Sequence, residues 1–559
     1  MDYVWIVVSL GLVLLAIYHY IASKKEELEN NSKRFLKEYE NSLERTLSSE
    51  EYESLSYYFQ KKKEGLSSGY YINDDTANDL DFDLIYSMLN NTNSSVGREV
   101  LYALLRIPSF SAKHLSKMDE TANFFMKEEE QRLATQQVFT QIGYTKNHSV
   151  YETLEKLMSF QAPGVLGDYL GTIALIASIV VMLGIRADVG LISFLLVLSY
   201  QVIRYFQKKA VIFPYLDCVR WLVRLLYGTK KLNALSMELP YEQGEILKKL
   251  YEDSKEILPG MFTIACGADA SGSLLDSFMD YVRIVFHVDL IHFSKVLKKI
   301  QKKEENFFQL YEALGYLECG IATAAFRNKL PYYSFPDLTN SLEENYRVVD
   351  VIHPLVKDAV ANSMDTKKSV LLTGSNASGK STFLKAIALN ALLSQSLATS
   401  PSREYHGCFY RMMSSMSHRD AIASGDSYYM VEIKALKQIV DAANEDHASA
   451  PLLCFLDEVL RGTNTMERIA ASGEVLRALS KKSLCFAATH DIELTTDLSE
   501  EYSNYHFEEG FVKEDIHYSY EILPGPATSR NAIKLLAQIG FDEKIVDAAW
   551  KRAQKSLLF

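Results

Sequence analysis

The chain has 559 residues, of which 48% are hydrophobic and 23% charged, so it is long enough for several domains with buried cores. Its formal net charge of -12 argues against a protein that coats nucleic acid nonspecifically, because that task needs a basic surface; a local DNA track stays open. The six cysteines are scattered without a C-x-x-C pair, which disfavours a zinc or disulfide framework and is typical of a reducing cytosolic setting.

The first predicted element is an apolar stretch of 20 residues, Tyr3 to Ala22, which as a helix of about 30 Å matches a bilayer core. A cleaved signal peptide is the alternative, although it normally has a basic start and a shorter apolar stretch. Here Asp2 precedes the stretch and Lys24 follows it, so the positive-inside bias places the rest of the chain in the cytoplasm. We therefore expect a transmembrane anchor over residues 1–23. A charged, solvated helix should follow, from Lys24 to about Tyr70.

A second apolar region has two arms, Tyr169 to Ile185 and Val189 to Ile203, separated by Arg186, Ala187 and Asp188. Both arms are apolar on every face, which favours a membrane hairpin over the alternative of a buried hairpin in a soluble protein. The second arm would be only about 22 Å long as a helix, which is short for a bilayer core. We predict a transmembrane hairpin over residues 165–205, with both of its ends in the cytoplasm.

The regions 75–160 and 205–340 carry helical spacing with few strand signals. A lysine-rich stretch from Lys295 to Lys303 is interpreted as a solvated helix face, with a nucleic-acid or lipid contact as the alternative. His287 and Asp289 would lie about 200° apart on a helix, so they cannot converge on a metal ion.

A glycine-rich loop follows at residues 374–382 and fits the pattern G-x-x-x-x-G-K-[ST], which wraps nucleotide phosphates. The preceding Ser369 to Leu372 is typical of a buried strand, and Thr382 to Leu393 is typical of a helix. Lys380 supplies a charge to the β- and γ-phosphates, and Ser381 offers its hydroxyl to Mg²⁺. The residues predicted to bind the nucleotide are Gly374, Ser375, Asn376, Ala377, Ser378, Gly379, Lys380, Ser381 and Thr382.

Two further apolar strands end in polar residues. Leu452 to Leu456 is followed by Asp457, a candidate Mg²⁺ ligand, and by Glu458, which can orient or deprotonate the attacking water. Ser483 to Thr489 ends at His490, which can donate to the γ-phosphate or the water. Glu458, His490 and Lys380 are therefore the predicted catalytic residues, with Ser381 and Asp457 holding Mg²⁺.

The runs around these motifs resemble the ATPase domain of the MutS DNA mismatch repair family, a relative of ABC-type ATPases. The resemblance lies in residues 420–432, in the D-E-V-L-R-G-T-N-T run from Asp457, and in A-T-H ending at His490. The tail from Leu523 to Ala548 is similar to the helical element through which these ATPases dimerise. Upstream, residues 89–108 and 317–354 resemble the start and end of the family's helical core.

The resemblance implies that ATP and Mg²⁺ are the cofactors, with no other small-molecule substrate, and that the ATPase domains form a homodimer. Ser427 would reach the γ-phosphate of the partner subunit's ATP, and Asn376 would help to hold the γ-phosphate side of the same site. The chain departs from the family in having too few residues before the core for a mismatch-reading domain, and in carrying a membrane hairpin. The stretch from Ala359 to Asp365 also lacks an aromatic residue for stacking on adenine.

The expected fold is an α/β P-loop ATPase domain of the ABC/MutS type, preceded by a mostly α-helical core or lever region with a transmembrane helix and a transmembrane hairpin. The predicted parts are an anchor (1–23), a cytosolic helical region with the MutS-like core start (24–160), the hairpin (165–205), a helical lever region (206–340) and the ATPase domain with its dimerisation element (341–559). The predicted function is a membrane-anchored, dimeric ATPase that moves helical arms, with lipid as a partner and DNA as a possible one. The alternative is a membrane-tethered DNA clamp of the mismatch repair or recombination type.

Overall fold

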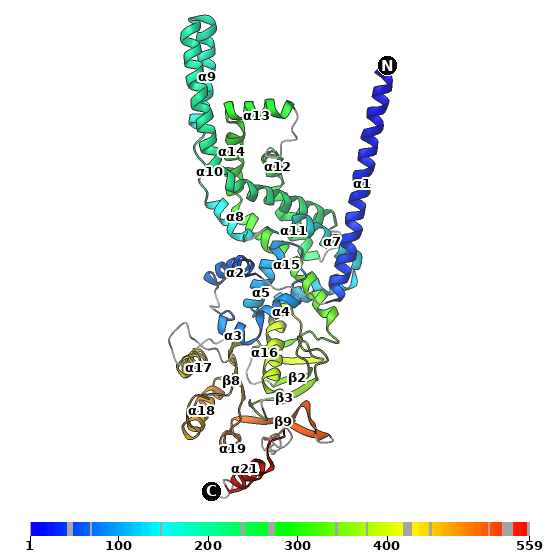
Figure 1. The fold of residues 1–559 in the computed structure, drawn as a ribbon, viewed down its shortest axis with the longest axis vertical. Coiled ribbons are helices and arrows are strands. Elements are labelled where there is room, and N and C mark those ends of the chain that lie inside the picture. The colour runs from blue at the N-terminus through cyan, green and yellow to red at the C-terminus, as the bar shows by residue number, and fades with distance from the viewer. Residues whose placement is uncertain are drawn as a thin grey trace.

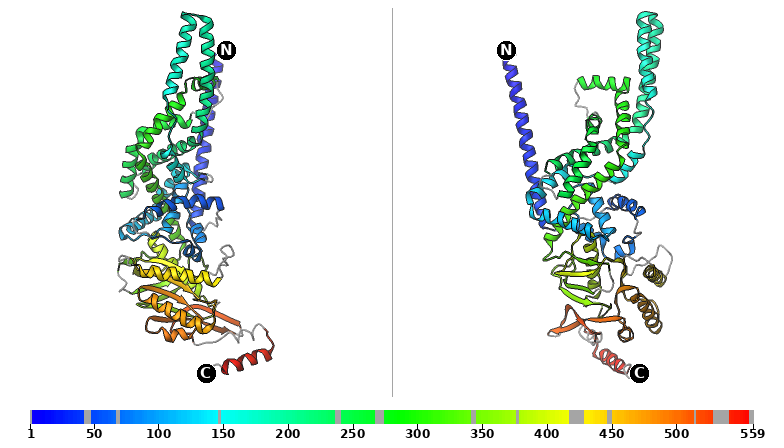
Figure 2. Two further views of the ribbon diagram at one scale, coloured as in Figure 1. Left: turned by 90° about the vertical axis from the view of Figure 1, so that its left-hand side faces the viewer. Right: turned by 180° about the vertical axis from the view of Figure 1, so that it is seen from behind.

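The protein is elongated in the computed structural model, with the α/β part at one end and a pair of long helices at the other (Figure 1). The N-terminal helix rises from the middle of the molecule in the same direction as this pair, on the opposite side of the helical region (Figure 2). The structure describes residues 2–41, 48–66, 70–145, 148–235, 241–266, 274–340, 345–375, 378–416, 428–445, 450–512, 515–527 and 540–555.

In the first 330 residues, the regular elements that the structure describes are all helices, which agrees with the helical spacing predicted for 75–160 and for 205 onward. The helices are α1 (Asp2–Glu40), α2 (Ser49–Glu64), α3 (Asp74–Asp79), α4 (Phe82–Leu89), α5 (Ser95–Arg106), α6 (Ala112–Lys127), α7 (Glu129–Ile142), α8 (Val150–Ser159), α9 (Leu166–Gly184), α10 (Ala187–Leu235), α11 (Tyr241–Ser254), the 3₁₀ turn η1 (Lys255–Ile257), α12 (Leu258–Cys266), α13 (Leu274–Phe286), α14 (Val288–Gln301) and α15 (Glu304–Lys329).

The predicted hairpin consists of α9 and α10, which are long and apolar enough to cross a membrane by length and composition. Both expose large apolar side chains along their length, including Ile176, Leu183 and Leu196. The second arm does not end at Ile203 as predicted. It continues as one helix of 49 residues to Leu235, through Pro214, so the apolar arm and the body of the protein share one helix.

The prediction that the helix after the anchor is solvated is wrong for the residues near Phe35 and Tyr39. The helix α1 runs unbroken to Glu40, and near its end Phe35 and Tyr39 are buried. Their i, i+4 spacing places both side chains on one face of the helix, which packs against α7 and α15. The guanidinium of Arg132 lies 3.7 Å from the centroid of the Tyr39 ring. In α2, Leu55 and its neighbours are likewise part of the core.

The centre of the helical region is the packing of α15 against α5 and α6, where a Cβ atom on Gly315 would lie 2.3 Å from the Val100 side chain and one on Gly320 would lie 2.4 Å from the Thr121 side chain. The carboxylate of Glu318, from α15, accepts hydrogen bonds from the Asn93 backbone N–H and the Ser94 hydroxyl at the start of α5. Burial raises the pKa of Glu318 to about 8. The two segments predicted to form the helical core are therefore held together by a buried carboxyl group.

The C-terminal part is an α/β domain with two sheets and helices on their faces (Figure 1). One sheet has the strand order β1-β5-β2-β3 and the other β10-β9-β4-β8-β7-β6. The elements are β1 (Asp337–Thr339), β2 (Tyr346–Val351), β3 (Asn362–Thr366), β4 (Ser369–Thr373), α16 (Lys380–Leu397), β5 (Glu404–Cys408), β6 (Arg411–Ser415), α17 (Tyr428–Asn444), β7 (Leu452–Asp457), α18 (Thr465–Ser480), β8 (Ser483–Ala488), α19 (Glu493–Asp497), β9 (Tyr502–Val512), β10 (Asp515–Pro524) and α21 (Glu543–Lys555).

The strands β4, β8, β7 and β6 run parallel, and β4, β7 and β8 are apolar and almost wholly buried. Continuous apolar runs are expected for parallel strands that are covered on both faces. Because these strands are parallel, the residues that follow β4, β7 and β8 lie together at the carboxyl-terminal ends of the strands, along one border of the sheet. The three predicted polar segments are thereby brought together.

The helical region docks on the α/β domain through α3, which lies beside the edge strand β6. The buried carboxylate of Asp79 accepts hydrogen bonds from the Ser414 hydroxyl (2.6 Å) and the Met416 backbone N–H (2.8 Å). Lys385 of α16 bonds to Asp81 at 2.5 Å. The helical region thus contacts both the edge of the sheet and the helix that follows the glycine-rich loop.

Candidate nucleotide-binding site

The glycine-rich loop leaves the end of β4 and enters α16. Gly374 has φ 143° and Gly379 has φ 104°, values that disfavour other residues. A Cβ atom at Gly374 would lie 2.9 Å from the Ser378 hydroxyl and 3.1 Å from the Phe507 carbonyl oxygen. The loop therefore needs glycine at both positions. The predicted residues Asn376 and Ala377 lie outside the described residues.

Lys380, the first residue of α16, turns its ammonium group into this loop. The group donates hydrogen bonds to the carbonyl oxygens of Gly374 (2.8 Å) and Ser375 (2.7 Å). The residue is almost fully buried, so the charge lies inside the loop. A phosphate bound at the start of α16 would meet this ammonium and the N-terminal backbone N–H groups together. Thr382 is exposed in the same first turn.

The two predicted Mg²⁺ ligands lie in contact. The hydroxyl of Ser381 donates a hydrogen bond to the carboxylate of Asp457 at the end of β7. Mg²⁺ prefers oxygen ligands and is typically held by one or two protein groups together with water and substrate phosphates. The Ser381 hydroxyl and the Asp457 carboxylate fit that donor set.

Two of the three predicted catalytic residues, Glu458 and His490, also meet. Nε2 of His490 lies 2.8 Å from the Glu458 carboxylate, whose other oxygen is 2.8 Å from Nη1 of Arg461. Glu458 has φ 54°, and its backbone N–H donates to the Ala488 carbonyl at 3.0 Å. The left-handed backbone turns the chain just after β7, so that the adjacent Asp457 and Glu458 face different partners. Arg461 was not predicted, although it belongs to the run from Asp457.

Two further contacts hold this edge of the sheet in place. The Arg468 guanidinium makes two hydrogen bonds to Asp491, at 2.8 and 2.6 Å, which raise the pKa of Arg468 and fix the loop after β8 against α18. The Glu432 carboxylate of α17 accepts a hydrogen bond from the Leu460 backbone N–H. The segment that ends at Glu432 is thus tied to the loop carrying Glu458. Ser427, just before α17, lies outside the described residues.

An aromatic residue that the sequence did not indicate lies over the loop. A Cβ atom on Gly379 would be 3.1 Å from the Tyr520 ring, and Tyr520 is 45% exposed. The side chain of Asn362 fixes this position by bonding to the Tyr520 carbonyl (3.0 Å) and the Ile522 N–H (2.8 Å). Asn362, from the segment predicted to lack an aromatic residue for stacking, thus holds in place an aromatic residue of β10.

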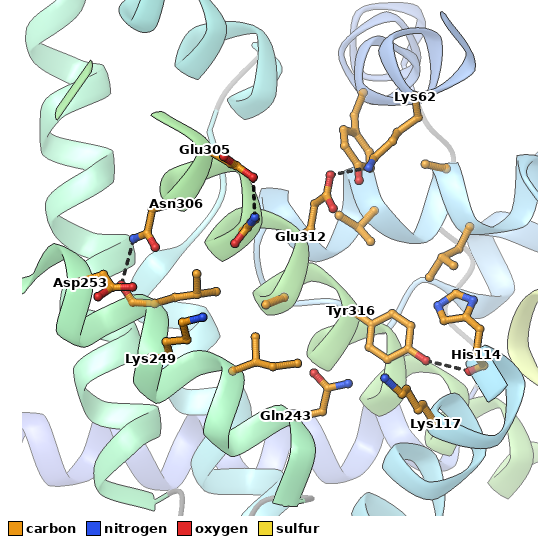
Figure 3. Close-up of a pocket in the computed structure, with 18 of the residues that line it drawn as sticks. Lys62, His114, Lys117, Gln243, Lys249, Asp253, Glu305, Asn306, Glu312 and Tyr316 are labelled. Atoms are coloured by element: carbon orange, nitrogen blue, oxygen red, sulfur yellow. Dashed lines mark hydrogen bonds and ion pairs between the residues drawn. The ribbon is translucent and has the colours of Figure 1, made fainter. Parts of the chain in front are cut away.

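A separate cavity of about 1040 Å³ lies among α2, α5, α6, α11 and α15 (Figure 3). Lys62 and Glu312 form an ion pair of 2.5 Å on one side of it, and Tyr316 bonds to the His114 carbonyl at 3.2 Å on another. None of the described nucleotide-site residues lines this cavity. Since α11 forms one wall and α15 another, movement of one helix against the other would change its volume.

Comparison with known proteins matches residues 370–557 to the family model MutS domain V. The C-terminal third of this chain therefore carries a domain that is similar to MutS domain V. The match to the DNA mismatch repair protein MutS of Thermus aquaticus has 32% identity over 203 residues, which is 35% of this chain and 24% of that protein. The MutS of Natronomonas pharaonis is 29% identical over 271 residues (46% of this chain, 30% of that protein), and MutS 2 of Haloarcula marismortui is 32% identical over 182 residues (32% and 19%).

The chain therefore spans between about a fifth and a third of the length of these curated MutS relatives. MutS domain V is an ATPase-type α/β domain, and the sheets and helices of residues 337–555 agree with that architecture. The family model covers β4, β7 and β8, and with them the loop, the two strand ends and Tyr520. The helical residues before position 337 lie outside the matched domain.

Proposed function

We propose that this chain is a membrane-anchored ATPase of the MutS type that binds ATP and Mg²⁺ between two copies and uses hydrolysis to move its helical region. The observation that supports this best is the meeting of the loop and the strand ends. The Ser381 hydroxyl contacts Asp457, and Glu458 and His490 follow within the same sheet edge. Phosphoryl transfer to water requires these elements: an anion cradle, a metal position and a group that orients water.

The proposed site works as follows. The loop N–H groups and Lys380 bind the phosphates, and Ser381 and Asp457 hold Mg²⁺, which neutralises the charge of the transferred phosphoryl group when bound. Glu458 orients and deprotonates the attacking water once Arg461 has moved away from it. His490 positions the Glu458 carboxylate. Tyr520 offers a ring face to the base.

The proposed coupling passes through the contacts of α3 and α16 with the helical region. Asp79 holds the end of β6, from which the chain leads into the segment containing Ser427. Arg327 of α15 bonds to the Ala398 carbonyl (2.8 Å) just after α16. A shift of α16 or β6 on nucleotide binding would therefore displace α3 and α15, which bond to them. We propose that α15 and α10 carry it toward the hairpin.

The membrane placement rests on the hairpin and on the first part of α1. We propose that α9, α10 and residues 1–23 cross the cell membrane and that the ATPase domain lies in the cytoplasm. Exposed Leu170, Ile173 and Leu195 would meet lipid rather than water. Extraction of membranes with carbonate tests this: the chain should stay with the membrane, and release into the supernatant would contradict the proposal.

Two variants separate binding from hydrolysis. Lys380→Ala should abolish ATP binding or turnover, because the phosphates lose their buried cation. Glu458→Gln should bind ATP normally but hydrolyse it about 10²–10⁴-fold more slowly, as expected for loss of a general base. Lys437→Ala, an exposed lysine of α17 that pairs with Asp441 on the same helix, is the matched control. Turnover at the wild-type rate in Lys380→Ala would show that the site is wrongly assigned.

The shared dimer site has its own test. Ser427→Ala and Lys380→Ala subunits, inactive alone, should recover part of the activity when mixed, because one of the two sites then receives intact residues from both subunits. No recovery in a mixed dimer shown to form by crosslinking would contradict sharing across the interface.

A second candidate is a membrane-tethered clamp that binds DNA, which the relatives' name, DNA mismatch repair protein MutS, supports. Electrophoretic retention of duplex or branched DNA should then fall by about 10³ or more between about 50 and 200 mM salt if six or more phosphates are contacted. Absence of retention at low salt would remove this candidate and leave the ATPase proposal standing.

A further inference from the structure

A buried polar cluster joins the base of the hairpin to the corner between α13 and α14. Nδ1 of His287 lies 2.9 Å from the Asp168 carboxylate, and Nε2 lies 2.9 Å from the Gln201 carbonyl oxygen. The exposed fraction of His287 is 0% and that of Asp168 is 0%. Lys208 bonds to the same carboxylate at 2.6 Å, and Arg204 lies 3.5 Å from it. We refer to these five residues as the base cluster.

The base cluster marks a level along the hairpin. Above it, toward the loop between α9 and α10, exposed side chains are apolar up to Arg186 and Asp188, which pair at the tip. At the cluster the first cations of α10 appear. Gly167 and Gly171 allow α9 to pack tightly against Arg204 and Gln201 here, since a Cβ atom would lie within 2.1–2.3 Å of those side chains. The uninterrupted apolar stretch of the hairpin therefore ends at the base cluster, where Arg204 and Lys208 enter α10, although Phe206, Val211 and Phe213 are exposed farther along that helix.

The chain turns at this level. His287 has φ 53° and separates α13, which ends at Phe286, from α14, which begins at Val288. The side chain of Gln201 also donates to the Val285 carbonyl at 3.4 Å, so the last turn of α13 is tied to α10. From this point α13 runs across the direction of the hairpin, whereas α14 descends toward the body (Figure 1).

The sequence of α13 separates polar from apolar residues. At about 100° per residue, Asp280 and Arg283 fall within about 60° of each other. Asp280 and Arg283 form an ion pair of 2.8 Å. Tyr281 falls on the other side of the helix, among apolar residues, and is 68% exposed. A helix of this kind, with one charged edge and a wide apolar face, suits the boundary between water and lipid.

We propose that α13 lies flat on the cytoplasmic surface of the bilayer, held at that level by the base cluster, with the apolar face that carries Tyr281 in the headgroup region. This inference rests on the proposed membrane placement of the hairpin. Three observations support lipid as the occupant rather than a second copy of the chain. The helix ends beside the base cluster, it runs across the direction of the hairpin (Figure 1), and exposed apolar side chains occur both on it (Tyr281) and on α9 next to the cluster (Leu170 and Ile173).

The experiment uses the full chain reconstituted in vesicles of phosphatidylethanolamine and phosphatidylglycerol. Single cysteines for an environment-sensitive fluorophore are placed by Tyr281→Cys, by Arg283→Cys on the opposite face of α13, by Leu195→Cys in the hairpin and by Met466→Cys in the ATPase domain. The background carries Cys266→Ser, since the other five cysteines are buried. Lipids with a spin label near the headgroup or near the end of the acyl chain report depth, and ATP hydrolysis reports folding.

The label at position 281 should be quenched about two-fold or more better by the shallow spin label than by the deep one, and better than the label at 283, as expected for a helix whose face enters about 5–10 Å. Position 195 should be quenched by the deep label and position 466 by neither. If 281 behaves like 466 while 195 is quenched, the inference about α13 is overturned and the hairpin proposal stands. If 195 is also unquenched, the membrane proposal itself fails. Equal quenching of the labels at 281 and 283 by the deep spin label would show that the helix is immersed in the bilayer. Crosslinking of position 281 to the same position in a second copy, without quenching, would show a protein interface. Either result contradicts the inference.

Discussion

Among the histidine–carboxylate pairs of the described residues, one in the α/β domain and one at the base of the hairpin differ mainly in their surroundings. In the ATPase domain, His490 and Glu458 are 2.8 Å apart, with side chains 39% and 13% exposed. At the base of the hairpin, His287 and Asp168 are 2.9 Å apart, with side chains 0% and 1% exposed. The first pair is partly open to solvent. The second is saturated by Lys208 and by a backbone carbonyl. Under the proposed function the same chemical pair takes part in the reaction at one place, whereas at the base of the hairpin it ties α9 to the corner between α13 and α14.

The largest effect is expected when the buried pair is disrupted, and the quantity that changes is the free energy of unfolding. His287→Ala leaves the Asp168 carboxylate buried with fewer partners and should lower the free energy of unfolding by about 3 kcal/mol. ATP hydrolysis by the folded variant should change little. His292→Ala, which removes a bond to the Gly260 carbonyl at 3.1 Å, is the matched control. Denaturation in detergent measures the difference; equal stability of the two variants would contradict the architectural role.

A third buried carboxyl group, Glu318, sharpens the comparison because its described contacts are hydrogen-bond donors without a full charge. Its pKa is raised to about 8 from 4.5, chiefly by burial, so its contribution to stability is fully present below pH 4.5 and is lost as the pH rises through 8. Across this window the unfolding free energy should fall by on the order of 2–4 kcal/mol. Glu318→Gln should remove most of that fall, as thermal unfolding between pH 5 and pH 9 would show.

Glu99 adds a smaller change of the same sign, because burial raises its pKa to about 7. The double variant with Glu99→Gln is therefore the appropriate control. A wild-type unfolding free energy that rises across the same pH window would contradict both assignments.

The exposed pair should show the opposite pattern to the buried one. His490→Ala should slow hydrolysis by about ten- to a hundred-fold, because Glu458 loses the group that positions it. The free energy of unfolding should change by no more than about 0.5 kcal/mol, as for other substitutions at the surface. Steady-state turnover and denaturation of the same preparation test both statements. A loss of unfolding free energy comparable to that of His287→Ala would mean that both pairs stabilise the fold.

The smallest effect is expected at Arg461, whose guanidinium is 54% exposed and competes with water for Glu458. Arg461→Ala should change turnover by a factor of only about two to five, corresponding to about 1 kcal/mol or less for an exposed ion pair. Arg477→Ala, another arginine at the surface of the ATPase domain, serves as the comparison. A hundred-fold loss in Arg461→Ala would instead place the arginine on the nucleotide.

Much of the ATPase site was predictable because its information is local. Apolar runs identify β4, β7 and β8, and parallel strands bring their ends to one edge, so the contacts of Ser381 with Asp457 and of Glu458 with His490 follow from spacing. The position of Tyr520 over Gly379 does not, since it depends on an irregularity in β10 between Tyr518 and Ile522.

The helical region was predictable in type but not in its contacts. The expectation that His287 and Asp289 lie on different sides of one helix missed the corner at His287, which sends the two side chains to different partners: His287 to Asp168, and Asp289 to Tyr205. Those partners are more than 80 positions away in the sequence. Burial of Phe35 was likewise hidden in a segment rich in charge.

The uninterrupted course of α10 has a consequence for where work can be delivered. A helix of 49 residues is about 74 Å long, more than twice the thickness of a hydrocarbon core. Pro214 does not end it. With the apolar end of α10 in the bilayer, as proposed, the helix would transmit a rotation or displacement that arises in the ATPase domain to the far leaflet. Nucleotide turnover would then change the outer side of the membrane without a second protein.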